Sequence, residues 1–175
     1  MVNDHANCSE ENNRTHEYEL AFVHENDIAG IAAIHAASFD DAWSGAMVRR
    51  ILSMPGTFGV VARQIRQRSI AGFALGRVAA DQCEILSLAV DTQHRGVRVG
   101  GLLLDGAIHQ AAEGGAETLF LEVAEDNNVA RTLYHSRDFA PVGRRPNYYV
   151  RKDGTSAAAV TMSREIGVGS VRNSA

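Results

Sequence analysis

The sequence predicts a single-domain α/β fold, with a mixed central sheet and helices on both of its faces. Two strand-to-helix units indicate this class: an apolar strand-like run at 83–90 precedes a helix-like segment from Val99, and a second unit occupies 119–139. A length of 175 residues, 45% of them hydrophobic, suits one domain with a sizeable core. We therefore expect one structural unit over most of the chain.

The two ends differ from the rest of the chain in composition. Residues 1–16 are polar and mixed in charge, and residues 167–175 are rich in glycine and serine. Such segments are commonly flexible and lie outside a core. The predicted domain therefore spans residues 17–166, between a flexible polar leader and a flexible tail.

The chain before the first unit predicts a strand and two helices. Tyr18, Leu20 and Phe22 alternate as in a strand, and Asn26 or Asp27 can cap the helix that follows. One face of that helix carries apolar residues and a histidine, namely Ile28, Ile31, Ala32 and His35.

A short helix and a hairpin are expected next. Ser44 can cap the helix, which ends near Met54. The runs 57–63 and 70–78 read as two strands joined by a polar reversal. After the strand at 83–90 and its helix, a further strand, a helix and two final strands complete the predicted sheet.

The turn between the strand at 83–90 and the helix from Val99 is the most informative segment. It contains Arg95, Gly96 and Arg98, and Gly100 lies in the first turn of the helix. Free N–H groups at a helix start attract anions, and glycine lets a phosphate approach the backbone. The P-loop lysine and the dinucleotide glycine spacing are both missing, so another pyrophosphate-bearing ligand is favoured.

Charge and composition exclude several classes of protein. A formal net charge of −4 and a pI near 6.0 argue against bulk nucleic-acid binding. Cys8 and Cys83 predict neither a disulfide framework nor a cysteine zinc site, and the histidines lack the spacing of metal ligands, so we expect no catalytic metal. The sequence shows no secretory signal and no apolar run long enough to span a membrane, so we expect a cytoplasmic protein. A local basic patch could still hold an anionic cofactor, and its candidates are Arg95, Arg98, Arg144 and Arg145.

Two motifs give the chain a resemblance to a known family. The run Arg95-Gly-Val-Arg-Val-Gly100 and the pattern Asn127-x-x-Ala-x-x-Leu-Tyr134 resemble the GNAT superfamily of N-acetyltransferases over roughly Tyr18 to Glu165. Leu-Glu-Val at 121–123 and the run 143–149 look like the bacterial enzymes that acetylate the N-terminal alanine of a small-subunit ribosomal protein. The resemblance implies a GNAT fold and acetyl-CoA as cosubstrate.

Two residues depart from the family pattern. Arg98 stands where the family's cofactor motif usually has glycine, and Asp138 replaces the glycine that usually precedes Phe139. At both positions the family's turns favour glycine, which adopts left-handed backbone conformations readily.

The resemblance also implies which residues bind acetyl-CoA. Without it, Leu88, Ala89 and Val90 are ordinary core residues, and Asn127 is an N-cap, for which Asn128 competes. With it, the backbone of the strand, the glycine turn and the asparagine are expected to contact the cofactor. The predicted set is Leu88, Ala89, Val90, Gly96, Val97, Arg98, Val99, Gly100, Gly101 and Asn127.

Two side chains are candidates for the acyl-transfer chemistry. Glu122, between two apolar residues, can take the proton of an acceptor amine, and Tyr134 can protonate the departing thiolate. Without the resemblance, Glu122 is more commonly an outward-facing strand carboxylate and Tyr134 a core aromatic. Tyr148 and Tyr149 can flank a peptide terminus, although strand propensity explains them equally well.

The acceptor is narrowed by energetics and by the resemblance. At pH 7, deprotonating an α-amine costs ~1 kcal/mol and deprotonating a lysine ~4.6 kcal/mol, which favours a protein N-terminus. The resemblance points to a ribosomal N-terminal alanine, while another N-terminus, a lysine or a small amine stays open. The alternative from a different functional class is a non-catalytic sensor that binds acyl-CoA.

Overall fold

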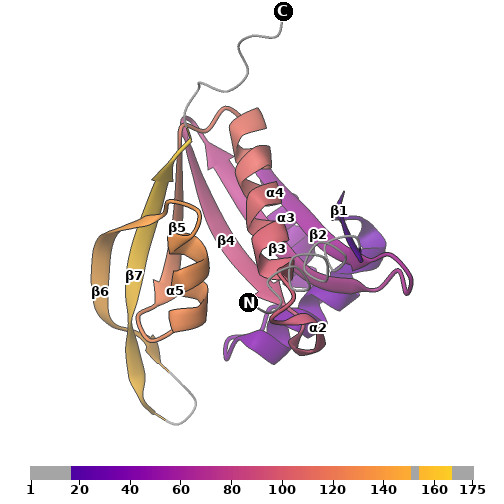
Figure 1. The fold of residues 1–175 in the computed structure, drawn as a ribbon, viewed down its shortest axis with the longest axis horizontal. Coiled ribbons are helices and arrows are strands. Elements are labelled where there is room, and N and C mark those ends of the chain that lie inside the picture. Colours follow the sequence, from indigo (N-terminus) through magenta and orange to yellow (C-terminus); the bar gives the residue numbers. More distant parts are fainter. Residues whose placement is uncertain (1–16, 151–153, 167–175) are drawn as a thin grey trace, which may run out of the picture.

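The computed structural model describes residues 17–150 and 154–166 (Figure 1). The predicted leader, the predicted tail and Cys8 lie outside this part of the chain. The elements in order are β1 (Tyr18–Phe22), the 3-10 helix η1 (Glu25–Asp27), α2 (Ile28–Ser38), α3 (Gly45–Leu52), β2 (Thr57–Gln64), β3 (Ile70–Ala79), β4 (Gln82–Val90), the 3-10 helix η2 (Thr92–His94), α4 (Val99–Glu113), β5 (Thr118–Ala124), α5 (Asn128–His135), β6 (Ala140–Val150) and β7 (Ser156–Glu165).

The strands form one mixed sheet in the order β1-β2-β3-β4-β5-β7-β6. Neighbours are antiparallel except β4 and β5, which run parallel. Helices α2 and α3 cover one face, and α4 and α5 lie on the other (Figure 1). The predicted α/β class, the mixed sheet and the helices on both faces are therefore confirmed.

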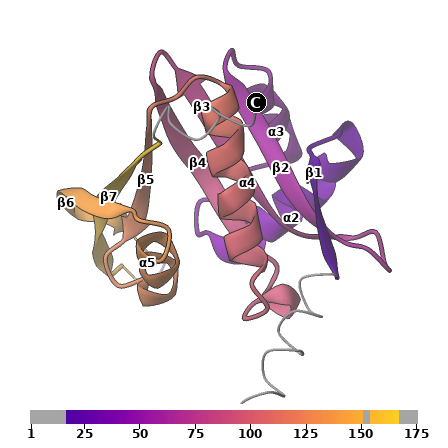
Figure 2. The ribbon, with the colours of Figure 1, turned by 45° about the horizontal axis from the view of Figure 1, so that its top comes forward.

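Strands β4 and β5 pair over only part of their length. The ladder runs from Gln82 opposite Thr118 to Ile85 opposite Leu121 and then stops. Beyond that point β5 stays paired with β7 up to Ala124, so β5, β7, β6 and α5 turn away from β4 together (Figure 2). The sheet therefore opens between β4 and β5.

Most predicted boundaries agree with the structure, and the cap of α2 is the exception. Ser44 caps α3 by accepting a hydrogen bond from the Met47 N–H at 3.2 Å. The Asp27 side chain makes no such cap. Its Oδ2 accepts bonds from the His24 N–H at 2.8 Å and from Arg63 at 2.7 Å, and Asp27 is 4% exposed. Asp27 therefore anchors η1 and α2 to β2 through a buried ion pair.

Cys83 is a free, buried cysteine of β4. Burial raises the pKa of its thiol to about 11, so the group stays neutral at physiological pH. Across the described chain, the helices are too short or too polar to cross a bilayer.

The two departures from the family pattern occupy the same kind of backbone conformation. Arg98, the N-cap of α4, has φ of 69°, and Asp138, after α5, has φ of 62°. The Asp138 N–H bonds to the His135 carbonyl and the Phe139 N–H to the Tyr134 carbonyl, both at 3.1 Å, which is the Schellman pattern that favours glycine. Both positions therefore carry left-handed residues where glycine would be relaxed.

Replacing Asp138 by glycine should stabilise the protein. Glycine adopts the left-handed conformation without strain, which stabilises the folded state, and this gain exceeds the cost of the greater freedom that glycine has in the unfolded chain. Asp138→Gly should therefore raise the free energy of unfolding by up to about 1 kcal/mol. Asp138→Ala is the matched control, because it removes the same carboxylate and keeps the strain. Urea denaturation of both variants measures the difference. Equal stability of the two variants would contradict the prediction.

His35 holds the loop between α2 and α3. Its Nδ1 accepts a hydrogen bond from the Trp43 N–H at 3.2 Å, and the two rings stack with centroids 4.5 Å apart. Phe39 packs on the same imidazole at 4.4 Å. Burial lowers the pKa of His35, and nearby Asp41 acts in the opposite direction. The imidazole is therefore neutral in the folded state at neutral pH, with Nδ1 free to accept.

This histidine should make stability fall in mild acid. Because the folded pKa of His35 lies below the unfolded value of about 6.5, protonation favours the unfolded chain. Its contribution is complete above that value and is lost as the pH falls through the folded pKa. Denaturation at several pH values should show a shallower acid loss for His35→Gln than for His109→Gln, which removes an exposed histidine of α4. Parallel losses in the two variants would argue against this role.

Candidate functional site

The opening between β4 and β5 exposes backbone groups of β4. The Asp91 N–H donates to the carbonyl of Ala71 in β3 at 2.8 Å. Along an antiparallel strand, the backbone groups of successive residues point alternately toward one neighbouring strand and toward the other. The N–H and C=O groups of Leu88 and Val90 therefore point toward β5, which does not pair there, whereas those of Ala89 point toward β3. The opening thus offers backbone groups of two of the three predicted strand residues, Leu88 and Val90, to an extended ligand.

The turn after β4 leads directly into the start of α4. Gly96 has φ of 77°, which an L side chain rarely adopts, and Arg95 folds back so that its Nε donates to the Val90 carbonyl at 3.1 Å. The first helical bond joins the Leu102 N–H to the Arg98 carbonyl at 3.1 Å. The amides of the residues before Leu102 thus lack acceptors within α4, as an anion-binding helix start requires. Those amides belong to Val99, Gly100 and Gly101.

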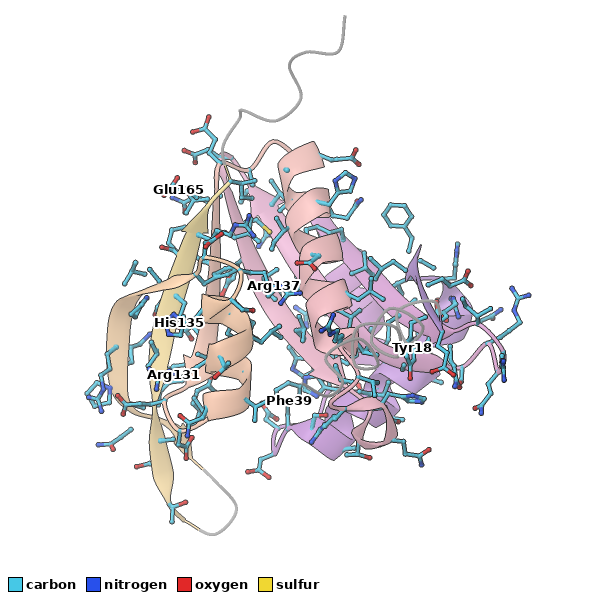
Figure 3. The ribbon with its side chains drawn as sticks, viewed as in Figure 1. Tyr18, Phe39, Arg131, His135, Arg137 and Glu165 are labelled. Atoms are coloured by element: carbon cyan, nitrogen blue, oxygen red, sulfur yellow. The ribbon has the colours of Figure 1, made fainter. Side chains whose placement is uncertain are left out.

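The two glycines of α4 are packed differently. A Cβ on Gly100 would lie 3.3 Å from the Leu133 side chain of α5, so the helix start and α5 approach closely there. A Cβ on Gly101 would collide with the guanidinium of Arg137. Arg137 lies just after α5 (Figure 3). Its Nε is 3.0 Å from Oδ1 of Asp105 in α4. Gly101 therefore has a packing role between the two helices, and its contact with the cofactor stays a prediction, as does that of Val97.

Glu122 lies at the edge of the opening, one residue beyond the last β4–β5 pair. Its neighbours on β5 are buried against α4 and α5, so its side chain points to the face that carries α2 and α3. The side chain is 19% exposed, and its Oε1 is within 3.4 Å of the Thr161 hydroxyl of β7. Arg145 of β6 forms an ion pair with the same oxygen. The carboxylate is thus held in place and is accessible from one face.

The expected basic patch is corrected by the structure. Arg144 pairs with Glu125 through two bonds of 2.7 Å, and Arg145 pairs with Glu122. Adjacent strand residues point to opposite faces, so these two ion pairs lie on opposite faces of the sheet. Neither arginine joins Arg95 at the glycine turn, because β6 lies at the far edge of the sheet. The sequence could not indicate this separation, which depends on strand order.

Tyr134 of α5 is 7% exposed and packs on Phe139, with centroids 5.9 Å apart. Burial, with a smaller contribution from Tyr149, raises the pKa of Tyr134 to about 12. Its hydroxyl is protonated at neutral pH and has no hydrogen-bond partner within the described ranges, so it can donate a proton or a hydrogen bond to a ligand. Tyr134 is thus both a core aromatic and a candidate acid.

Asn127 caps α5, since its Oδ1 accepts from the Ala130 N–H at 3.1 Å. Asn128 is the first helical residue and does not compete for that position. The capping bond uses only the oxygen of the Asn127 amide. Its nitrogen can still contact a ligand, and the predicted cofactor contact stays a prediction.

Sequence reasoning missed two features of the site. The ion pair of Arg145 with Glu122 was not expected, because no local sequence pattern links β6 to β5. Ser87 of β4 is not among the predicted site residues, yet it is 8% exposed and its hydroxyl is without a hydrogen-bond partner in 17–150 and 154–166. No group of histidine, cysteine or acidic side chains in those same ranges is arranged to hold a metal.

Comparisons with known proteins agree with this geometry. The sequence model of the acetyltransferase (GNAT) family matches residues 28–139. A ribosomal protein bS18-alanine N-acetyltransferase of Haemophilus influenzae is 37% identical over 99 residues, 57% of this chain and 67% of that protein. The protein of the same name from Haemophilus ducreyi is 30% identical over 139 residues, 79% of this chain and 94% of the relative.

A solved structure supports the fold independently. The crystal structure of the ribosomal-protein-S18-alanine N-acetyltransferase from Escherichia coli superposes with a TM-score of 0.78. It is 24% identical and covers 90% of this chain and 99% of its own, so it speaks for the fold alone. With the family match over more than half of the sequence, the opened sheet and the glycine turn, the chain belongs to the acetyltransferase (GNAT) family and is an acetyl-CoA-dependent N-acetyltransferase.

Proposed function

We propose that this N-acetyltransferase transfers acetyl from acetyl-CoA to the N-terminal alanine of a small-subunit ribosomal protein, with bS18 as the first candidate. The relatives with 37% and 30% identity carry that substrate in their names. The observation on which the chemistry depends is Glu122, held beside the opening between β4 and β5 and accessible from the face of α2 and α3. A base in that position can meet an amine while the thioester occupies the opening.

Glu122 is the proposed base. Attack on a thioester requires a neutral amine, and an α-amine of pKa about 7.8 loses its proton at a cost of ~1 kcal/mol at pH 7. A lysine would cost ~4.6 kcal/mol. A single carboxylate held in an ion pair is better suited to removing the proton of an α-amine than that of a lysine. This favours a protein N-terminus over a lysine side chain as the acceptor.

Tyr134 is the proposed acid for the departing thiolate. With a tyrosine pKa of about 12, against about 8.5 for a cysteine-like thiol, complete proton transfer is uphill by roughly 3.5 units or ~5 kcal/mol. A turnover of about 10 per second corresponds to a barrier near 16 kcal/mol, which leaves room for that cost. The burial that makes the tyrosine a weak acid also keeps its proton in place until the thiolate forms.

The substrate assignment is tested by offering the enzyme a choice of amines. Peptides with each N-terminal residue, lysine peptides and small amines would be incubated with acetyl-CoA, and mass spectrometry would locate the acetyl group. We expect acetylation of the α-amine of alanine peptides, with the bS18 N-terminus among the best. Preference for lysine or a small amine would overturn the assignment. Tight acetyl-CoA binding without any acetylation would favour the acyl-CoA-binding sensor.

The two proposed proton-transfer groups are tested separately. Glu122→Gln and Tyr134→Phe should each lower the single-turnover rate by about 10²- to 10⁴-fold, with acetyl-CoA affinity nearly unchanged. Glu122→Gln should recover in part at higher pH, because the amine then loses its proton without help. Glu113→Gln, at the exposed end of α4, is the matched control and should keep the parental rate. A parental rate at neutral pH in folded Glu122→Gln would assign the base role to water or a backbone carbonyl.

A further inference from the structure

Ser87 carries a buried hydroxyl that no part of the described protein satisfies. The residue is 8% exposed, and its Oγ lacks a hydrogen-bond partner across the described residues. It lies at a register shift between β3 and β4. Gly76 of β3 is opposite Ile85, whereas Leu75, the residue before Gly76, is opposite Ser87. An unpartnered buried hydroxyl destabilises the folded protein, and a bound ligand with a matching polar group would offset that cost.

The ladder fixes the face to which Ser87 points. Its partner Leu75 belongs to the core formed with α2 and α3, so Ser87 faces α2 and α3. The following residue, Leu88, packs in the other core, with α4. Ser87 therefore shares its face with Glu122, and not with the helix start that forms the predicted phosphate site.

Ser87 and Glu122 stand on opposite sides of the opening. Pairing of β4 with β5 ends at Ile85 opposite Leu121. Beyond that pair, Glu122 is the first residue of β5 on the α2 and α3 face, and Ser87 follows Leu86 on the same face of β4. Leu86 and Ala89 offer this face no polar side chain. Ser87 is thus the polar side chain that β4 presents across the opening from Glu122.

We propose that Ser87 Oγ accepts a hydrogen bond from an N–H of the acceptor amine while Glu122 removes a proton from the same nitrogen. The inference rests on the proposed acylation of an amine at this opening. The ammonium proton leaves first, to solvent by way of Glu122, which returns to its carboxylate form. The nitrogen lone pair of the neutral amine then forms the C–N bond while Glu122 takes one of the two remaining N–H protons. The C–S bond breaks with its electrons on sulfur, and Tyr134 supplies the proton to the thiolate and is reprotonated from solvent. The hydrogen that remains on the amide nitrogen is the one that Ser87 holds.

This arrangement makes Ser87 a specificity-determining residue for primary amines. A neutral primary amine has two N–H groups, one for Glu122 and one for Ser87, with its lone pair directed at the thioester carbon. A neutral secondary amine, such as N-methylalanine, has only one N–H and cannot satisfy both oxygens. The enzyme should therefore discriminate against N-methylated and proline N-termini, and the discrimination should depend on the Ser87 hydroxyl.

The test compares Ser87→Ala and Ser87→Cys with the parent on the best amine found in the panel and on its N-methyl form. Both variants should lower kcat/KM for the primary amine by about 3- to 30-fold, with less loss for cysteine, which keeps the volume and a weak acceptor. The parental preference over the N-methyl amine should shrink by a similar factor. Acetyl-CoA affinity and the free energy of unfolding should not fall.

Thr57→Val is the matched control, because Thr57 is another hydroxyl without a partner, on β2 away from the opening. It should leave the kinetics unchanged. Parental kcat/KM in folded Ser87→Ala, or equal losses for the primary and the N-methyl amine, would overturn the proposal while the proposed function stands. A primary amine other than alanine as best acceptor would overturn only the alanine assignment, since the comparison is then made on that amine. No turnover with any amine would overturn both.

Discussion

The partial pairing of β4 with β5 is the constraint on which the rest of this structure depends. A strand edge inside a folded domain leaves N–H and C=O groups without partners, and such groups are costly when they are buried. Here the ladder stops after Ile85 and Leu121, and the freed groups of β4 face the opening at whose edge Glu122 lies. The missing strand contacts are therefore available to a ligand with its own extended row of polar groups, such as the pantetheine arm of acetyl-CoA.

Keeping the sheet open requires support on both sides of the gap. The strands β5, β7 and β6 form their own antiparallel unit, and α5 closes it against α4. Arg137 forms an ion pair with Asp105 of α4. The guanidinium of Arg137 can approach α4 because Gly101 has no side chain. On the other side, the Asp27–Arg63 pair fixes η1 to β2. The two halves share the core beneath α4, and their strands pair through one short parallel ladder, so the strands can remain apart at one end.

The Glu122–Arg145 ion pair fixes the position of the carboxylate that we propose as the base. Arg145 lies 4.7 Å from the centre of the Tyr148 ring, and Tyr148 packs edge-on against Tyr149 at 5.1 Å. These aromatic residues occupy an irregular stretch of β6, where the register shifts between Arg145 and Tyr149. The carboxylate is therefore oriented by a guanidinium that is itself held by an aromatic ring.

The sequence by itself determined the order and type of the elements, the glycine turn and the family, because these follow from periodicity, caps and short motifs within single segments. It also marked Arg98 and Asp138 as unusual, and their positive φ values supply the physical reason. Only the tertiary structure decided which side chains meet. The pairing of Arg145 with Glu122 and the position of Ser87 depend on strand order, on a register shift and on where one ladder ends. Those features arise from contacts between distant segments, which no local pattern records.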